Sequence, residues 1–180
     1  MYIVRGHNMG LYFFDGRTDV RRCPTCQHLL RKWEEDLTCV PIKKFRKYDV
    51  GASYDGIDVW SSRAKAIYES AEMTGLRFIP LAHPNLYAAR AEAVMHYDSS
   101  CPNTRFENQC MTCGNWEFVG IGTPVVLMPG SHVAPLGFAR TDVEFAAKDG
   151  KQPLLICGDE AAKILKSAKL KGLDLEKIKT

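Results

Sequence analysis

The chain has 180 residues, of which 46% are hydrophobic and 25% charged, and this is the composition of an ordinary globular protein. A chain of this length can bury a core that folds without disulfides or metal, so any metal would fix a local arrangement. The net charge of +3 does not by itself indicate nucleic-acid binding, and no apolar run approaches the roughly 18–20 residues of a membrane span.

The first sixty residues predict short strands and little helix. Two β-forming clusters, 2–4 and 11–14, are separated by the turn-forming stretch 6–10. One or two helical turns are expected within 28–36. Residues 37–59 mix β-forming residues with glycines, which indicates irregular structure or short strands.

The middle of the chain predicts one helix and two strands. Ser61 or Ser62 can cap the helix, whose apolar residues recur at spacings of three and four, and Gly75 is a natural stop. A short strand at 76–79 should end at Pro80. Alternating apolar residues in 86–97 favour a second strand.

The last eighty residues begin with a loop at 98–115 and end in a regular unit. Short strands are expected at 116–120, 124–127 and 138–145. A buried strand at 154–157, a helix from Asp159 to about residue 170 and a final strand at 173–178 predict a compact β-α-β-like unit.

Together these elements predict an α+β fold in one small domain, 1–180, with a mixed or antiparallel sheet and a few helices. A subdivision into a zinc-tied part, 1–120, and a C-terminal α/β part, 121–180, is an alternative. The start of the chain lacks the features of a secretory signal, so we expect a cytoplasmic protein.

The chain contains seven cysteines, and four of them form two C-x-x-C pairs. The odd number and the missing signal argue against a disulfide framework. Zn²⁺ prefers four tetrahedral ligands, and a tight turn between two cysteines, a zinc knuckle, can supply two thiolates. We therefore predict one structural zinc ion per chain, with the following ligands: Cys23, Cys26, Cys110 and Cys113. Because 83 residues separate Cys26 from Cys110, the metal would clamp two distant segments together.

Two other interpretations of the cysteine pairs stay open. A Cys-Pro-x-Cys sequence can be a redox pair on a thioredoxin-like scaffold, although the flanks of Cys23 fit poorly. The thiols could also carry no metal. Cys101 and His28 lie near the pairs in sequence and could replace a ligand, whereas Cys39 and Cys157 are expected to be small buried residues.

We find no phosphate-binding loop, nucleophile elbow, paired-histidine zinc helix or dinucleotide fingerprint in the sequence. Four thiolates would also close the zinc site to substrate. The sequence therefore predicts a binding protein and not an enzyme.

The order of these motifs resembles the double-CXXCG motif family, first recognised in myxobacteria. The resemblance rests on the early pair Cys23–Cys26, the pair followed by glycine at Cys110–Gly114, and the closing pattern of strand and helix from Phe138 to Leu173. That family often has a further cysteine where this chain has Cys101. The chain departs from the pattern at Gln27, where the family has glycine.

The resemblance implies an immunity protein of a bacterial toxin–immunity pair, which binds a cognate toxin domain in the cytoplasm and blocks it. The implied partner is thus a protein, with no membrane and no nucleic acid involved. The alternative is a zinc-ribbon-like nucleic-acid-binding module that uses the basic run Lys43–Lys47 with Phe45 and Tyr48.

Overall fold

The computed structural model describes residues 1–178, so the last two residues of the predicted domain lie outside it. It is one small domain with a mixed sheet and two α-helices, as predicted. The helices are α1 (Ser62–Ser70) and α2 (Asp159–Ser167), with two 3₁₀ turns, η1 (Lys32–Glu34) and η2 (Lys148–Gly150). The strands are β1 (Tyr2–Asn8), β2 (Val50–Ala52), β3 (Asp58–Ser61), β4 (Leu76–Leu81), β5 (His83–Ala91), β6 (Val94–Met95), β7 (Arg105–Gln109), β8 (Trp116–Gly120), β9 (Phe138–Ala147), β10 (Gln152–Cys157) and β11 (Leu173–Lys177).

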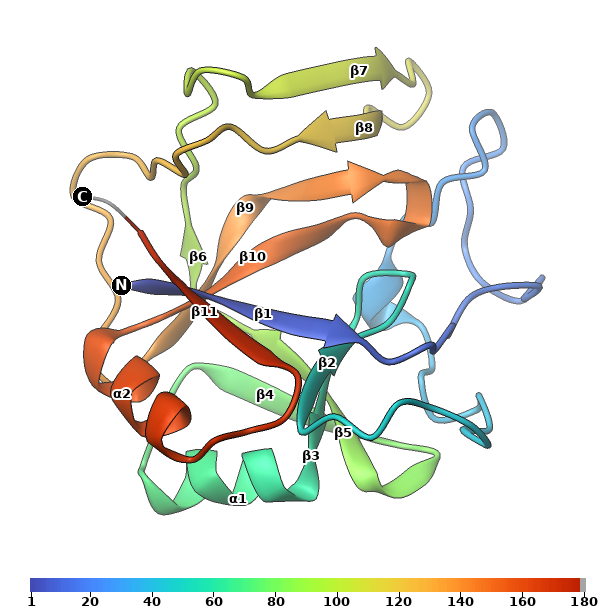
Figure 1. Cartoon of the computed structure of the whole chain (residues 1–180). Helices are drawn as coiled ribbons and strands as arrows, with labels where there is room; N and C mark the ends of the chain where they lie inside the picture. The colour runs from blue at the N-terminus through green and yellow to red at the C-terminus, as the bar shows by residue number, and fades with distance from the viewer. Residues whose placement is uncertain (179–180) are drawn as a thin grey trace.

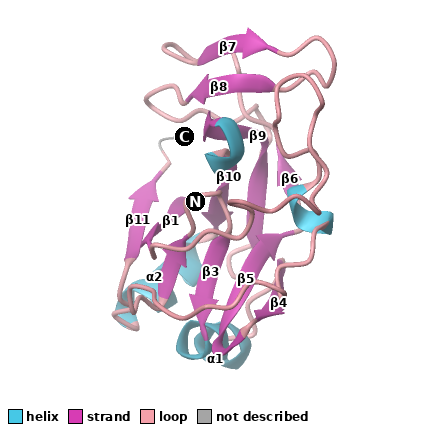
Figure 2. Ribbon diagram, turned by 90° about the vertical axis from the view of Figure 1, so that its right-hand side faces the viewer, coloured by secondary structure: helices cyan, strands magenta, loops and turns pink. Residues whose placement is uncertain are grey.

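The sheet runs in the order β4-β5-β3-β2-β1-β10-β9-β8-β7, with β11 paired to β1 and β6 paired to β9. Among the strands of residues 1–178, only the β1–β2 and β6–β9 pairs are parallel. Because β6 follows β5 closely in sequence and pairs with β9, the sheet curves back on itself. Figure 1 shows the helices at one end of the molecule and the β7–β8 hairpin at the other. Figure 2 shows the same separation from the side.

The C-terminal strands and the N-terminal strand are interleaved. β1 pairs antiparallel with both β10 and β11, and α2 connects these two strands. Ala161, Ala162 and Leu165 of α2 are buried in the same cluster as Trp60 and other residues of the core. The beginning and the end of the chain therefore share one hydrophobic core.

Helix α1 starts where the sequence predicted and ends earlier. Ser61 accepts a hydrogen bond from the backbone N–H of Ala64 at 3.2 Å, as an N-cap residue does. The helix ends at Ser70, five residues before Gly75. Gly75 serves another purpose, because a Cβ atom there would lie 2.3 Å from the carbonyl oxygen of Phe138.

Three further expectations for strands were wrong. Residues 11–14 form no strand, since Phe13 and Phe14 are buried and their N–H groups donate to the Asp55 carboxylate at 2.6 and 2.8 Å. Strand β4 continues through Pro80, because it lies at the edge of the sheet, where a missing N–H is tolerated. Residues 124–127 make only an isolated bridge, between Leu127 and Tyr97. No helix in residues 1–178 has both the length and the apolar character needed to cross a membrane.

Candidate metal centre

The four cysteines of the two C-x-x-C pairs come together in space. Cys23 and Cys26 lie in the long loop between β1 and β2, and Cys110 and Cys113 lie in the turn between β7 and β8. All four sulfur atoms lie within 4.8 Å of one another, and no disulfide joins them. In Figure 1 the N-terminal loop reaches up beside the β7–β8 turn. The structure thus brings together the four predicted ligands.

The two cysteine turns have the same backbone conformation. In the first knuckle (residues 22–29), the N–H of Cys23 donates to the carbonyl of His28 at 2.9 Å, and the N–H of Gln27 donates to the carbonyl of Cys23 at 2.9 Å. The second knuckle (residues 109–116) repeats both bonds at 2.8 Å, at Cys110, Gly114 and Asn115. Antiparallel pairs close the two turns at matching positions, Arg22 with Leu29 and Gln109 with Trp116.

Equivalent residues of the two knuckles also contact each other. The sulfur–sulfur distances are 3.8 Å for Cys23 with Cys110 and 3.7 Å for Cys26 with Cys113. The hydroxyl oxygens of Thr25 and Thr112 lie 2.8 Å apart. Contacts between equivalent positions are what a two-fold axis produces. The knuckles are therefore related by a local two-fold axis, although their flanking sequences do not match.

The sulfur geometry fits a tetrahedral metal. With metal–sulfur bonds of about 2.3 Å, a tetrahedral zinc ion would hold its thiolates about 3.8 Å apart. Two of the six sulfur–sulfur distances, 3.8 and 3.7 Å, agree with this spacing, and none exceeds 4.8 Å. The four thiols are thus compatible with one structural metal ion.

The residue after each C-x-x-C pair adopts a left-handed conformation, with φ of +60° at Gln27 and +73° at Gly114. Gln27 therefore replaces the expected glycine without changing the turn. Its side-chain amide donates to the carbonyl of Pro24 at 3.2 Å, which ties it to its own knuckle.

We expect the two positions to respond differently to substitution. Gly114→Ala should destabilise the protein by about 1 kcal/mol, because a Cβ there meets no neighbour and the cost is the left-handed backbone alone. Gln27→Gly should change stability by less than about 0.5 kcal/mol, because relief of strain is offset by the entropy of the unfolded chain. Chemical denaturation of both variants in buffer that contains zinc checks this, and equal losses of stability would contradict it.

Backbone N–H groups favour thiolates in both knuckles. The N–H groups of Cys113 and Thr112 lower the pKa of Cys110 to about 6. The N–H groups of Cys26 and Thr25 lower the pKa of Cys23 in the same way.

Cys26 shows that the four thiols resist joint ionisation. The N–H of His28 lowers its pKa, but burial and the thiols of Cys110 and Cys23 outweigh that bond and raise the pKa to about 12. Four thiolates at this spacing need a cation to offset their mutual repulsion.

The turn η2 holds the first knuckle from outside the cysteine loop. Asp149 accepts hydrogen bonds from the N–H of Leu29 at 3.0 Å and from the guanidinium of Arg22 at 2.6 Å. Both partners belong to the pair of residues that closes the knuckle.

A buried lysine after η2 holds the second knuckle. The ammonium of Lys151 donates to the carbonyl of Trp116, and Lys151 is 3% exposed. Burial lowers the pKa of Lys151, while Glu144 and the thiols of Cys113 and Cys26 raise it in opposition. A second buried lysine, Lys32, donates to the carbonyls of Asp149 and Lys151 at 2.8 and 2.6 Å. The segment 149–151 therefore braces both knuckles and places a positive charge near the sulfurs.

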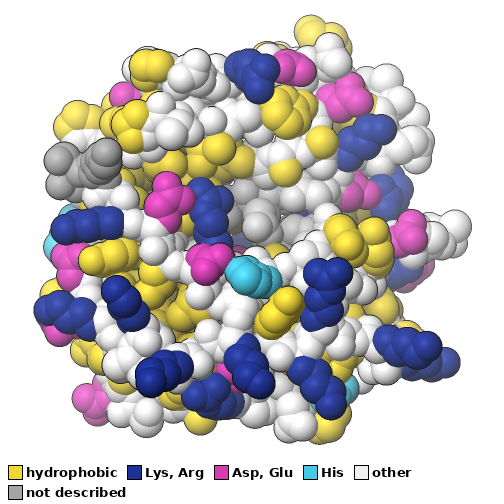
Figure 3. All heavy atoms as spheres, viewed as in Figure 1, with side chains coloured by type: hydrophobic (Ala, Val, Ile, Leu, Met, Phe, Trp, Pro, Cys, Tyr) yellow, Lys and Arg dark blue, Asp and Glu magenta, His cyan; other side chains and the backbone are white. Residues whose placement is uncertain are grey.

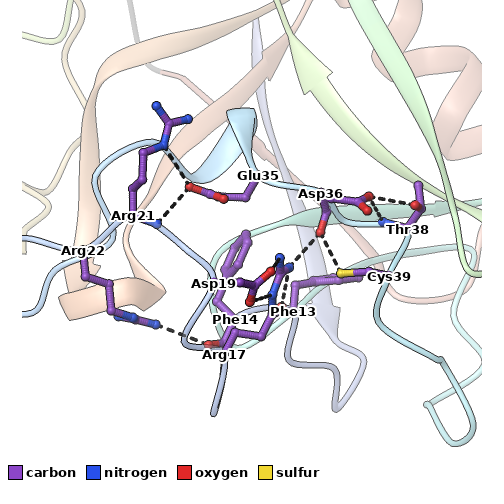
Figure 4. Close-up of polar contacts among 10 residues, drawn as sticks. All are labelled: Phe13, Phe14, Arg17, Asp19, Arg21, Arg22, Glu35, Asp36, Thr38 and Cys39. Carbon is purple, nitrogen blue, oxygen red and sulfur yellow. Dashed lines mark hydrogen bonds and ion pairs between the residues drawn. The ribbon is translucent and has the colours of Figure 1, made fainter.

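Arginine side chains fix the loop that carries the first knuckle. Arg17 donates to the carbonyl of Asp36 at 2.7 Å, and Arg22 donates to the carbonyl of Phe14 at 3.3 Å (Figure 4). These bonds satisfy backbone groups of a segment with little regular structure. The loop is thus positioned by side chains where secondary structure is sparse.

The other cysteines and His28 lie outside the four-sulfur cluster. The thiol of Cys101 is buried and donates to the carbonyl of Pro124 at 3.0 Å. Burial lowers the pKa of His28 to about 4, and its ring lies 3.7 Å from Asp149. Cys157 is buried as expected, but Cys39 is exposed, and its thiol donates to the carbonyl of Asp36.

No protein-family model matches this chain. A search of curated proteins likewise found no match.

Proposed function

We propose that this protein neutralises a cognate bacterial toxin in the cytoplasm by binding it, and that one structural zinc ion holds the binding scaffold. The observation that carries the proposal is the cluster of four thiols between two matched knuckles. The motif order resembles the double-CXXCG family, and the left-handed Gln27 removes the main departure from that pattern. In such a protein, the zinc ion that joins the two knuckles and the C-terminal β-α-β-like unit would both support the fold.

Zinc is the metal we propose for chemical reasons. Four thiolates at tetrahedral spacing form the ligand set of structural zinc sites. Such a site leaves no open coordination position for a substrate, so we propose no catalysis at the metal. The zinc would instead order the knuckles before a partner arrives, which lowers the entropy cost of association.

We propose the face around the knuckles as the toxin-binding surface. Met111, at the tip of the second knuckle, is 92% exposed. Beside it lies a groove of about 840 Å³ whose lining includes Met111, Trp116 and Lys148. Apolar and aromatic groups rimmed by charge are typical of sites where binding energy concentrates. An exposed methionine can also adapt its shape to a partner.

The test is co-expression with the product of the neighbouring gene. We expect rescue of growth and a complex that survives purification. Met111→Asp should weaken the complex at least about tenfold, because it places a charge in the apolar centre of the interface, while the zinc content stays unchanged. Met128→Asp is the matched control, since Met128 is also exposed but lies outside the knuckles.

Two outcomes would count against the proposal. If growth is not rescued and no complex forms, the proposal that this protein neutralises the toxin is wrong. If the Met111→Asp and Met128→Asp variants bind the toxin with equal affinity, the knuckle face is not the binding surface. Another face of the protein must then bind the toxin.

A nucleic-acid-binding module remains the second candidate, because basic side chains gather on one part of the surface. Figure 3 shows Lys and Arg over the helices and the loop before β2. However, Phe45 and Tyr48 pack against a hydrophobic cluster, so they are not free platforms for bases. Binding of a DNA or RNA duplex that weakens steeply as salt rises would favour this candidate.

A further inference from the structure

Three arginines from three strands line one hollow. The hollow has a volume of about 290 Å³, and its lining is Arg77, Arg90, Ala91, Glu92 and Arg140. Arg77 of β4 and Arg90 of β5 stand directly opposite each other in the antiparallel ladder. The backbone N–H of Arg140 in β9 donates to the carbonyl of Ala93, which brings the third arginine beside them.

This arrangement is unfavourable for an isolated protein. Like charges directly opposite each other on neighbouring strands destabilise a sheet. Burial lowers the pKa of Arg90, and the charges of Arg140 and Arg77 lower it further, whereas Glu144 and Glu92 oppose them. Three guanidinium groups thus share a space in which their mutual repulsion is only partly offset.

The partners of these arginines within residues 1–178 leave much of their hydrogen-bonding capacity unused. Arg77 has one loose contact, at 4.0 Å from Glu92. Arg90 lies over the ring of Trp33, with 5.3 Å between the guanidinium carbon and the ring centre. The Nε atom of Arg140 is buried without a hydrogen-bond partner in this part of the chain, and its Nη1 makes only a long bond of 3.4 Å. A buried donor without a partner is costly.

We propose that this hollow binds the phosphate group of a small phosphorylated molecule. A phosphate carries close to two negative charges and offers three or more acceptor oxygens, so each of three guanidinium groups can reach one. A single carboxylate offers two oxygens and one charge, which is too little for three arginines. The volume is at the lower end of the range for ligand pockets, which favours a small molecule over a polymer.

The experiment measures the thermal stability and the affinity of the full zinc-loaded chain with inorganic phosphate and with glycerol 3-phosphate. We expect both ligands to raise the Tm, and sodium chloride or acetate at the same ionic strength not to do so. Arg140→Gln and Arg90→Gln should weaken phosphate binding at least about tenfold, because each removes a charge-assisted hydrogen bond. Without phosphate, both variants should be as stable as the parent or more stable.

Arg105→Gln is the matched control, because Arg105 is an arginine over an aromatic ring, that of Phe118, outside the hollow. It should keep the full response to phosphate. Arg77 is more exposed, so Arg77→Gln tests the site even where Arg140→Gln does not fold.

Three results would overturn the proposal. The first is an equal response to phosphate in all variants, and the second is the same response to chloride or acetate. The third is tighter binding of a nucleic-acid duplex than of glycerol 3-phosphate, which would mean that the ligand of the hollow is a polymer and not a small molecule.

Discussion

Replacing Cys110 with serine is expected to abolish stoichiometric zinc binding and to lower the Tm by at least about 10 °C. The reason is that one metal ion would join two loops 87 residues apart, through two matched turns. Loss of one thiolate leaves an incomplete ligand set, and metal binding and folding are coupled. Metal analysis of the purified protein should find about one zinc per chain in the parent, and calorimetry should show the loss of stability.

Cys101→Ser is the control for this experiment. Cys101 is a buried cysteine whose thiol donates to the carbonyl of Pro124 and lies outside the cluster, whereas Cys110 is partly buried within it. This variant should keep the zinc. Retention of full zinc by Cys110→Ser, or its loss from Cys101→Ser, would show that the ligand set is wrong. A strong chelator should lower the Tm of the parent and leave that of Cys110→Ser unchanged.

Lys151→Met is expected to weaken zinc binding by about 10- to 100-fold, the range found for groups that support metal ligands. Its ammonium holds the carbonyl of Trp116, and the thiols of Cys113 and Cys26 interact with its charge. A zinc ion with four thiolates carries a net negative charge, which Lys151 would offset. Competition with a chromogenic zinc chelator measures the change in affinity.

Lys166→Met on α2 is the comparison for Lys151, because Lys166 is exposed and lies on the helix at the other end of the molecule. It should leave zinc affinity unchanged. Equal affinities of Lys151→Met and the parent would mean that the brace formed by residues 149–151 is not needed for the metal.

The sequence predicted the features whose signals are local. Two cysteines separated by two residues define each knuckle, and Ser61 followed by helical periodicity defines α1. The strand, helix and strand at the C-terminus were also predicted, because apolar residues form a run in the first strand, a stripe on the helix and an alternating pattern in the last strand. In all these cases the residues that carry the signal are close together in the chain.

Features that depend on distant partners were missed. Strand β7 was expected to be loop, since it is polar and mostly exposed, and its pairing with β8 defines it. Phe13 and Phe14 have high β propensity, but the distant carboxylate of Asp55 takes up their N–H groups. Tertiary contacts overrode propensity in both cases.

The residues that hold the two knuckles in place could not be predicted from the sequence either. Asp149 and Lys151 are ordinary surface residue types, and only the fold places them against the two knuckles. Gln27 was read as a departure from the motif, yet a non-glycine residue can adopt the left-handed conformation at a modest cost. Sequence spacing alone predicts neither the contacts of Asp149 and Lys151 nor the left-handed conformation of Gln27.

The position of β1 between β10 and β11 has a consequence for how the protein is made. A ribosome synthesises β1 and its neighbour β2 early, but β10 and β11, the partners of the first half of β1, are made only when the chain reaches residues 152–177. Until then residues 2–4 of β1 lack both strands with which they pair, so this apolar stretch stays unpaired in the nascent chain. The metal could join the two knuckles once residue 116 has emerged, and would shorten the search that β1 must complete.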